Sequence, residues 1–306
     1  MIERLRESIK EIFVGKDQVV EQVLICLLAG GHVLLEDVPG VGKTTLARTL
    51  AGAVSCEFGR IQFTPDTLPG DVTGTTVYNM KTGEFTYREG AVMHQILLAD
   101  EINRTSPKTQ ASLLEAMAEG HVTVDNTTYP LPEPFMVLAT QNPVEFAGTY
   151  PLPEAQLDRF MMRLTVGYPD NEAELAMARN HLQGRMAERV TAVVSPQEIL
   201  QMREEVRAVR VSDPVLQYIR DIIELTRTES GFVLGASPRA LLHLVGASQA
   251  CAYLAGRDYV KPDDVKAVAL NTLHHRLTLT AEARIRGEKT DRLLDALILK
   301  ARVPMD

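Results

Sequence analysis

The sequence contains no tryptophan, and aromatic residues make up only 5% of its 306 residues. Proteins that bind single-stranded nucleic acid without sequence preference stack bases on aromatic side chains, and such a platform is poorly supplied here. The net charge of −8 also argues against broad nucleic-acid binding, although a local basic pore could still exist. Both deficits count against nucleic acid as a partner.

Cysteines and long apolar runs are scarce as well. Cys26, Cys56 and Cys251 lie far apart among apolar residues and form no C-x-x-C pair, so we expect buried, reduced thiols. The longest apolar candidate, 23–35, is interrupted by glycines and is too short to cross a bilayer. The first residues carry mixed charge in a helical pattern, unlike a signal peptide. We therefore expect a cytoplasmic protein with no membrane span.

Metal-site signatures are also missing. The histidines show no H-E-x-x-H spacing and no partner cysteines, and we interpret them as ordinary structural residues. His274 and His275 are adjacent, so on a helix they would point about 100° apart and chelate poorly. The apolar fraction of 45% and charged fraction of 24% are those of an ordinary globular protein, and the length allows two domains.

One stretch, in contrast, has a specific pattern. Residues 33–35 are apolar, a glycine-containing loop follows, and Lys43-Thr44 opens an apparent helix. Glycines let backbone N–H groups point at an anion, and the positive end of the helix strengthens that field. The pattern predicts a phosphate cradle in which Lys43 reaches the β- and γ-phosphates and Thr44 binds Mg²⁺. The alternative is a strand–helix turn that binds nothing.

The cradle departs from the P-loop pattern at one position. That pattern has glycine where this sequence has Asp37. The loop therefore starts without the freedom of glycine, and a carboxylate beside phosphates has to point away. The sequence offers no explanation for this residue.

Two carboxylates end the next apolar run, 96–99. A continuous apolar run is typical of a strand buried on both faces, and open α/β sheets bind ligands at the carboxyl ends of such strands. There Asp100 would hold Mg²⁺, directly or through water, and Glu101 would act as general base on the attacking water. The alternative is a solvated acidic pair. A further strand at 135–140 leads to Asn142, whose amide could orient that water or contact the γ-phosphate, unless it only forms a turn.

The order of expected elements is that of an α/β protein with a parallel sheet. A polar β-hairpin within 71–90 should project from the sheet, either as a passive surface element or as a partner contact. Beyond residue 168 nearly every segment has a helical pattern. The sequence therefore predicts a nucleotide-binding core at 1–168 and a helical domain at 169–306. The expected helices lie at 2–13, 17–28, 43–53, 107–119, 154–160, 170–184, 213–229, 238–256, 262–277 and 290–300, with a further helix that starts at 195–198, and the expected core strands lie at 32–35, 60–63, 96–101, 135–140 and 162–166.

Arg239 lies in the first turn of the helix that Ser237-Pro238 is expected to start. The helix dipole disfavours a cation at that end. An anionic partner such as a phosphate would offset this cost. A solvated arginine is the alternative.

Five long motifs together resemble MoxR-type AAA+ ATPases of the helix-2-insert clade. They occupy residues 37–45, 97–104, 108–110, 139–143 and 150–160. The resemblance covers essentially the whole chain. It implies an α/β P-loop NTPase core with a C-terminal all-α lid domain, with ATP and Mg²⁺ as cofactors.

The resemblance also implies roles for residues of the core. Lys43 and Thr44 match the Walker A motif, and Asp100 and Glu101 match Walker B. Asn142 matches sensor 1. Further nucleotide contacts are implied for the adenine-lining stretch and for the rest of the phosphate loop: Val14, Gly15, Pro39, Gly40, Val41, Gly42 and Thr45.

Two distant arginines gain roles by the same resemblance. Arg159 matches the arginine finger that reaches the γ-phosphate of a neighbouring subunit, and Arg163 is a nearby competitor for that role. Arg239 matches sensor 2 on the lid. A finger supplied by a neighbour implies a homo-oligomeric ring, most simply a hexamer. The hairpin at 71–90 matches the insert that marks the clade.

The function implied is that of an ATP-driven molecular chaperone, which remodels or matures partner complexes, typically von Willebrand A domain proteins. A helicase-like nucleic-acid motor is one alternative, against which the acidic charge and few aromatics count. A chelatase-type motor subunit for metal insertion into a tetrapyrrole is another. A nucleotide-gated scaffold without catalysis is a third, and the intact Asp100-Glu101 pair argues against it.

Overall fold

The computed structural model describes residues 1–306 apart from 39, 143–147, 170, 183–189 and 305–306. The chain forms two compact units that interleave along the sequence. The first unit contains 1–21, 32–152 and 164–200, and the second contains 22–31, 153–163 and 201–306. The segment 153–163 thus packs with the C-terminal helices. The division at residue 168 stays a prediction.

The first unit is built on a five-stranded sheet of order β2-β5-β8-β1-β9, and the boundary between the units falls inside β9. The pairs β2–β5, β5–β8 and β1–β8 are parallel, which confirms the predicted parallel α/β core. The five strands are β1 (Val33–Glu36), β2 (Phe58–Gln62), β5 (Ile96–Asp100), β8 (Met136–Gln141) and β9 (Met162–Leu164).

The central strands owe their burial to continuous apolar runs. In β5 and β8 every residue is buried except the last, where the side chain turns polar. In the edge strand β2 only Gly59 is buried, so its apolar pattern is weak, and the strand begins two residues before the predicted 60–63. α3 (Lys43–Ala53) packs against β2 and β5, and α1 (Ile2–Ile12) packs on α3. The first unit also contains α5 (Pro107–Glu119) and α7 (Asn171–Leu182), while α2 (Asp17–Leu28) and α8 (Pro196–Ala208) are divided between the units.

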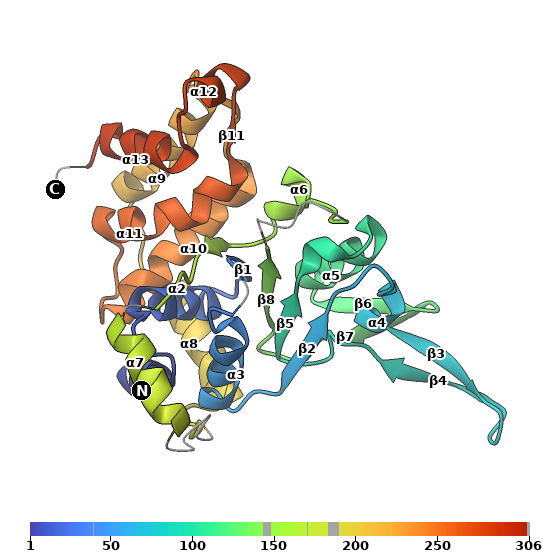
Figure 1. Ribbon diagram of the computed structural model, residues 1–306. Coiled ribbons are helices and arrows are strands. Elements are labelled where there is room, and N and C mark those ends of the chain that lie inside the picture. The colour runs from blue at the N-terminus through green and yellow to red at the C-terminus, as the bar shows by residue number, and fades with distance from the viewer. Residues whose placement is uncertain (39, 143–147, 170, 183–189, 305–306) are drawn as a thin grey trace. The chain divides into compact units, whose positions relative to one another are not determined.

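The predicted hairpin consists of β3 (Gly74–Asn79) and β4 (Glu84–Glu89), and it extends as an arm beyond β6 (His121–Val124) and β7 (Thr127–Pro130) (Figure 1). A short helix that the sequence did not predict, α4 (Pro69–Thr73), precedes it. Tyr87 anchors the base of the arm, because its hydroxyl donates to the Thr73 carbonyl at 2.6 Å and its ring stacks on Tyr129.

The second unit is mainly helical, as predicted. Its helices are α6 (Glu154–Leu157), α9 (Asp213–Thr228), α10 (Pro238–Leu254), α11 (Pro262–Leu273), α12 (Ala281–Ile285) and α13 (Thr290–Lys300). A two-stranded antiparallel ribbon, β10 (Phe232–Leu234) with β11 (Thr278–Leu279), adds to the helices and was not expected. Strands this short leave no readable alternation in the sequence. Within the ranges that the structure describes, no helix has both the length and the apolar character needed to span a membrane.

Candidate functional site

The phosphate loop takes its shape from two glycines in left-handed backbone conformations. Gly40 has φ 88° and Gly42 has φ 91°, a region that side chains with a Cβ rarely enter. Gly42 directly precedes α3, so Lys43, Thr44 and Thr45 form the first turn of that helix. The first N–H groups of a helix have no acceptor within the helix and suit an anion. Pro39, a predicted nucleotide contact, lies outside the described residues.

The loop after α1 lies beside this cradle. A Cβ built on Gly42 would come within 3.2 Å of the Phe13 ring, so residues 13 and 42 are neighbours. Val14 is exposed and Gly15 turns the chain at φ 77°. This placement puts Val14 and Gly15 next to the phosphate loop, as adenine-lining residues require. Their contact with a nucleotide stays a prediction.

Asp37 is explained by its hydrogen bonds. The residue is 7% exposed, and its carboxylate accepts from the Val38 N–H at 2.8 Å and from the Gly167 N–H at 2.5 Å. The carboxylate therefore ties the start of the loop to a distant turn of the same unit. The Asp37 backbone carbonyl accepts from Lys43 Nζ at 2.9 Å. The residue in the glycine position thus supports the loop from both its side chain and its backbone.

Lys43 is a half-buried cation among acidic groups. Burial lowers the pKa of its ammonium group, whereas Asp100, Asp37 and Glu101 act to raise that pKa. Lys43 therefore lies within electrostatic reach of both predicted Walker B carboxylates. A cation in this position is suited to an additional anionic partner such as a nucleotide phosphate.

Thr140 holds the two predicted Walker B residues, although the sequence did not single it out as a site residue. Its buried hydroxyl donates to Asp100 Oδ1 at 2.6 Å and accepts from the Glu101 N–H at 2.8 Å. Glu101 has φ 57° and ψ 50°, a strained left-handed conformation for a residue other than glycine. The backbone of the predicted general base is therefore strained, and the hydrogen bond from its N–H to Thr140 helps to stabilise that conformation.

The carboxylates have further partners that sequence reasoning missed. Arg60 donates to Asp100 Oδ2 at 2.8 Å. Gln62 donates to Glu101 Oε2 at 2.8 Å, and Arg104 donates to the same oxygen at 2.9 Å. Gln62 is the last residue of β2 and lies opposite Asp100 in the parallel register. Adjacent strand ends were the available signal, since β2 and β5 end at the same edge of the sheet.

The oxygen ligands available here fit Mg²⁺. In the described part of the chain, no group of three or more His, Cys, Asp or Glu side chains could hold a metal by itself. Nucleotide-bound Mg²⁺ uses one or two protein oxygens and takes the rest from phosphates and water. The Thr44 hydroxyl at the start of α3 and the Asp100 carboxylate supply that chemistry. Asn142 is buried directly after β8, at the same end of the sheet.

The predicted arginines belong to the second unit. Arg159 is half-buried and follows α6, whereas Arg239 is exposed as the second residue of α10. Arg163, the competitor of Arg159, donates from Nε to His274 Nε2 within this unit. The structure thus occupies the Arg163 guanidinium with an internal partner. The roles of Arg159 and Arg239 stay predictions.

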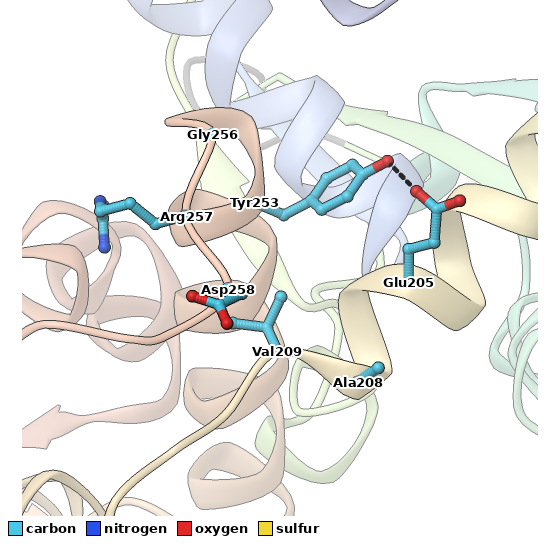
Figure 2. A pocket seen from close by; sticks show the side chains of 7 residues that line it. All are labelled: Glu205, Ala208, Val209, Tyr253, Gly256, Arg257 and Asp258. Atoms are coloured by element: carbon cyan, nitrogen blue, oxygen red, sulfur yellow. Dashed lines mark hydrogen bonds between the residues drawn. The ribbon is translucent and has the colours of Figure 1, made fainter.

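A cavity of about 470 Å³ in the second unit contains none of the predicted site residues (Figure 2). Tyr253 donates its hydroxyl to Glu205 across it, and burial followed by Glu205 raises the pKa of that hydroxyl. Arg257 is held by Asp264. Asp258 pairs with Arg210, so each charged or hydroxyl side chain that lines the cavity already has a partner.

Comparison with known proteins gives consistent matches. The family model described as "ATPase family associated with various cellular activities (AAA)" matches residues 32–162, and the AAA lid domain model matches 224–297. The protein YeaC of Bacillus subtilis, described as uncharacterized, is 49% identical over 98% of this chain and 93% of its own length. Chaperone MoxR1 of Mycobacterium tuberculosis is 43% identical over 92% of this chain and 77% of its own. Protein MoxR of Paracoccus denitrificans is 32% identical over 97% and 94%.

A solved structure agrees over the whole fold. The crystal structure of a protein from Cytophaga hutchinsonii, described as a candidate ATPase, superposes with a TM-score of 0.93. It is 40% identical, and the match covers 99% of this chain and 95% of that one. The likeness therefore extends over both units.

Proposed function

The chain belongs to the MoxR-type AAA+ ATPases and hydrolyses ATP, and from this premise we propose that it is a ring-forming molecular chaperone that remodels partner complexes. The observation that carries the site assignment is the convergence of Lys43, Asp100 and Glu101 at one end of the sheet. The chaperone role is supported by a relative, Chaperone MoxR1, that aligns over nearly the whole chain.

Each residue at the sheet end has a distinct task in this proposal. Lys43 neutralises the β- and γ-phosphates, and Thr44 with Asp100 would hold Mg²⁺, which offsets the charge of the transferred phosphoryl group. Glu101 accepts the proton of the attacking water once its carboxylate is released from Gln62 and Arg104. Asn142 orients that water.

Catalysis is completed by a second subunit. Arg159 is the finger that reaches the neighbouring γ-phosphate, as the resemblance of the segment 158–160 to the family motif implies. Arg239 contacts the nucleotide of its own subunit as sensor 2. Fingers of this kind contribute on the order of 10³–10⁵ in rate. The ring, most simply a hexamer, is therefore the active form, and a monomer hydrolyses ATP feebly.

The client-binding surface we propose is the tip of the β3–β4 arm. Tyr78, Met80 and Phe85 expose 52%, 90% and 73% of their surface there. Exposed apolar groups gathered on a projecting element are typical of protein contacts. We propose a von Willebrand A domain protein as the partner, in keeping with the family resemblance.

Subunit mixing tests the shared site. Arg159→Ala keeps an intact site but has no finger, and Glu101→Gln keeps the finger but has an inactive site. Each variant alone should lose about 10³-fold in hydrolysis, and an equimolar mixture should regain activity because one subunit supplies what the other lacks. The proposal would be contradicted if the specific activity of the wild-type protein did not depend on protein concentration and the Arg159→Ala variant kept that activity. In the control, the Arg159→Ala subunit also carries Lys43→Ala. A mixture of this double variant with Glu101→Gln should remain inactive, because neither subunit has a working site.

Client capture tests the chaperone role. Glu101→Gln should bind ATP without hydrolysing it and retain the client in a pull-down with ATP. Lys43→Ala, which should not hold ATP, is the matched control. A von Willebrand A domain protein retained by the first variant and not by the second supports the proposal. If neither retains such a protein, while DNA stimulates hydrolysis, a nucleic-acid motor is the better account.

A further inference from the structure

Arg276 is a buried cation in the second unit, with 1% of its side chain exposed. Its guanidinium donates to Asp158 Oδ1 at 2.8 Å and to the backbone carbonyls of Asp158, Phe160 and Met161 at 3.1, 2.6 and 3.3 Å. It also contacts the Thr272 carbonyl and His243 Nδ1. Most of these acceptors lie in 158–161, the segment that contains Arg159. One side chain therefore fixes the backbone on both sides of the predicted finger.

Ser237 links the same segment to α10. Its hydroxyl donates to Asp158 Oδ1 at 2.8 Å and accepts from the Ala240 N–H at 3.0 Å as the N-cap of the helix. Arg239 lies two residues further along. The Asp158 carboxylate thus receives one hydrogen bond from the anchor of the Arg159 segment and one from the cap of the helix that carries Arg239.

Arg239 also lies close enough to Arg276 for their charges to interact. Burial lowers the pKa of Arg276 to about 10, Asp158 acts to raise it, and Arg239 acts to lower it. Arg276 remains protonated at neutral pH, so its contacts are those of a cation. The two predicted phosphate-binding arginines therefore flank one connected cluster.

On the side that faces a cavity, the cluster is held by hydrogen bonds and not by close packing. A cavity of about 440 Å³ borders it and is lined by Glu154, Ala155, Asp158, Leu234, Gly235, Ser237 and Arg276. A close-packed core resists the shift of one side chain, whereas a group beside a cavity can move when a bond is lost. Removing one of these bonds should therefore displace the Arg159 segment.

We propose that Asp158, Ser237 and Arg276 form a latch that positions Arg159 and joins it to the start of α10, so that Arg159 and Arg239 shift together. The latch residues are positioning residues, and the inference rests on the proposed roles of the two arginines. A subunit whose Arg239 engages its own nucleotide would thereby place its Arg159 for the neighbouring site. The latch provides a direct physical link between the states of adjacent sites.

A ring mixed from two variants tests whether the latch of one subunit affects hydrolysis in the next. The donor subunit carries Glu101→Gln, so its own Arg239 makes no contribution to measured hydrolysis, and the acceptor carries Arg159→Ala. Adding Ser237→Ala to the donor should lower the kcat of the acceptor about tenfold, since a displacement of about 1 Å at a catalytic group can cost up to 10²-fold. The KM for ATP should not change, because the acceptor keeps its native phosphate loop. A change in the donor lid helix would thus be read out in its neighbour.

Thr280→Ala in the donor is the matched control. Thr280 caps α12 in the same unit, accepting from the Ala283 N–H at 3.2 Å, and has no bond to Asp158 in the described contacts. This donor should support full hydrolysis. Equal hydrolysis with the Ser237→Ala and Thr280→Ala donors, in rings of equal size by light scattering, would overturn the latch.

Asp158→Asn in the donor provides a second variant should Ser237→Ala impair assembly, and it should lower the acceptor kcat in the same way. The same substitution in the acceptor should have the smaller effect, because the acceptor has no finger to position and only its Arg239 depends on the latch. An effect that is equal in donor and acceptor would also overturn the latch. If the mixture of Glu101→Gln and Arg159→Ala subunits, without any latch substitution, regains no activity, Arg159 does not act on the neighbouring site. The latch proposal then fails together with that role.

Discussion

Arg60 pairs with Asp100 and Arg104 with Glu101, yet each arginine leaves over two-fifths of its side chain exposed. Arg276 exposes 1% and donates to Asp158 and to several backbone carbonyls. These two arginines at the sheet end of the first unit are therefore exposed cations beside the carboxylates. The second unit holds its central cation by burial and many acceptors.

The exposed arginines at the sheet end can respond to a ligand, whereas the buried Arg276 stabilises the fold. Exposed ion pairs contribute little, about 0–1 kcal/mol each, so a bound nucleotide can replace them at small cost. A buried arginine has already lost its hydration and cannot lose a partner without a large penalty. We expect substitutions at the sheet end to alter chemistry and substitutions in the latch to alter stability as well.

The largest expected effect is that of Arg276→Met. Removing the cation leaves Asp158 and buried carbonyls without their donor, so the free energy of unfolding should fall by about 3–5 kcal/mol. Denaturant titration followed by circular dichroism measures this loss. Arg60→Met is the control and should change stability by about 0–1 kcal/mol, since its ion pair is exposed. Equal losses in the two variants would remove the distinction between the regions.

The two regions also differ in how far they could be predicted from the sequence. The phosphate loop, the strand ending at Asp100 and the helix caps depend on particular residue types at fixed spacing. Ser237 accepts from the Ala240 N–H at the start of its helix, as predicted, and the same chemistry recurs where Ser106 accepts from the Thr109 N–H and Ser195 forms a capping box with Glu198. Such local sequence patterns were sufficient to predict most helices and strands.

The latch could not be predicted in the same way. Arg276 binds backbone carbonyls of residues more than 100 positions earlier, and a carbonyl acceptor has no residue type that a sequence pattern could reveal. The partner of Asp37 is likewise a backbone N–H, that of Gly167. Thr140 and Gln62 were missed because their roles arise from neighbouring strand ends. Long-range polar contacts were thus the part that required a structure.

Asp37 is an exception in the first unit, because it is a buried charge whose carboxylate accepts two backbone hydrogen bonds inside the ligand-binding region. Asp37→Ala would leave the Gly167 N–H without its acceptor, and the free energy of unfolding should fall by about 1–3 kcal/mol. Asp37→Asn retains an acceptor oxygen and should lose less. Denaturant titration of the two variants checks the order. A larger loss for Asn than for Ala would show that the hydrogen bond is not the reason for this residue.

The remaining effect concerns the dependence of stability on pH, and it should come from the second unit. His274 donates from Nδ1 to the Leu270 carbonyl at 2.9 Å and accepts at Nε2 from Arg163, so the bonding pattern requires a neutral ring. Burial, followed by the charge of Arg163, lowers the pKa of His274 to about 4. Between pH 6.5 and 4 the unfolded chain binds a proton that the folded chain does not. Stability should therefore decrease as pH falls through this window, by up to about 1.4 kcal/mol per pH unit from this residue. Unfolding titrations at pH 7 and 5 should show a smaller decrease for His274→Gln than for His121→Gln, a control in the first unit, and equal decreases would contradict the assignment.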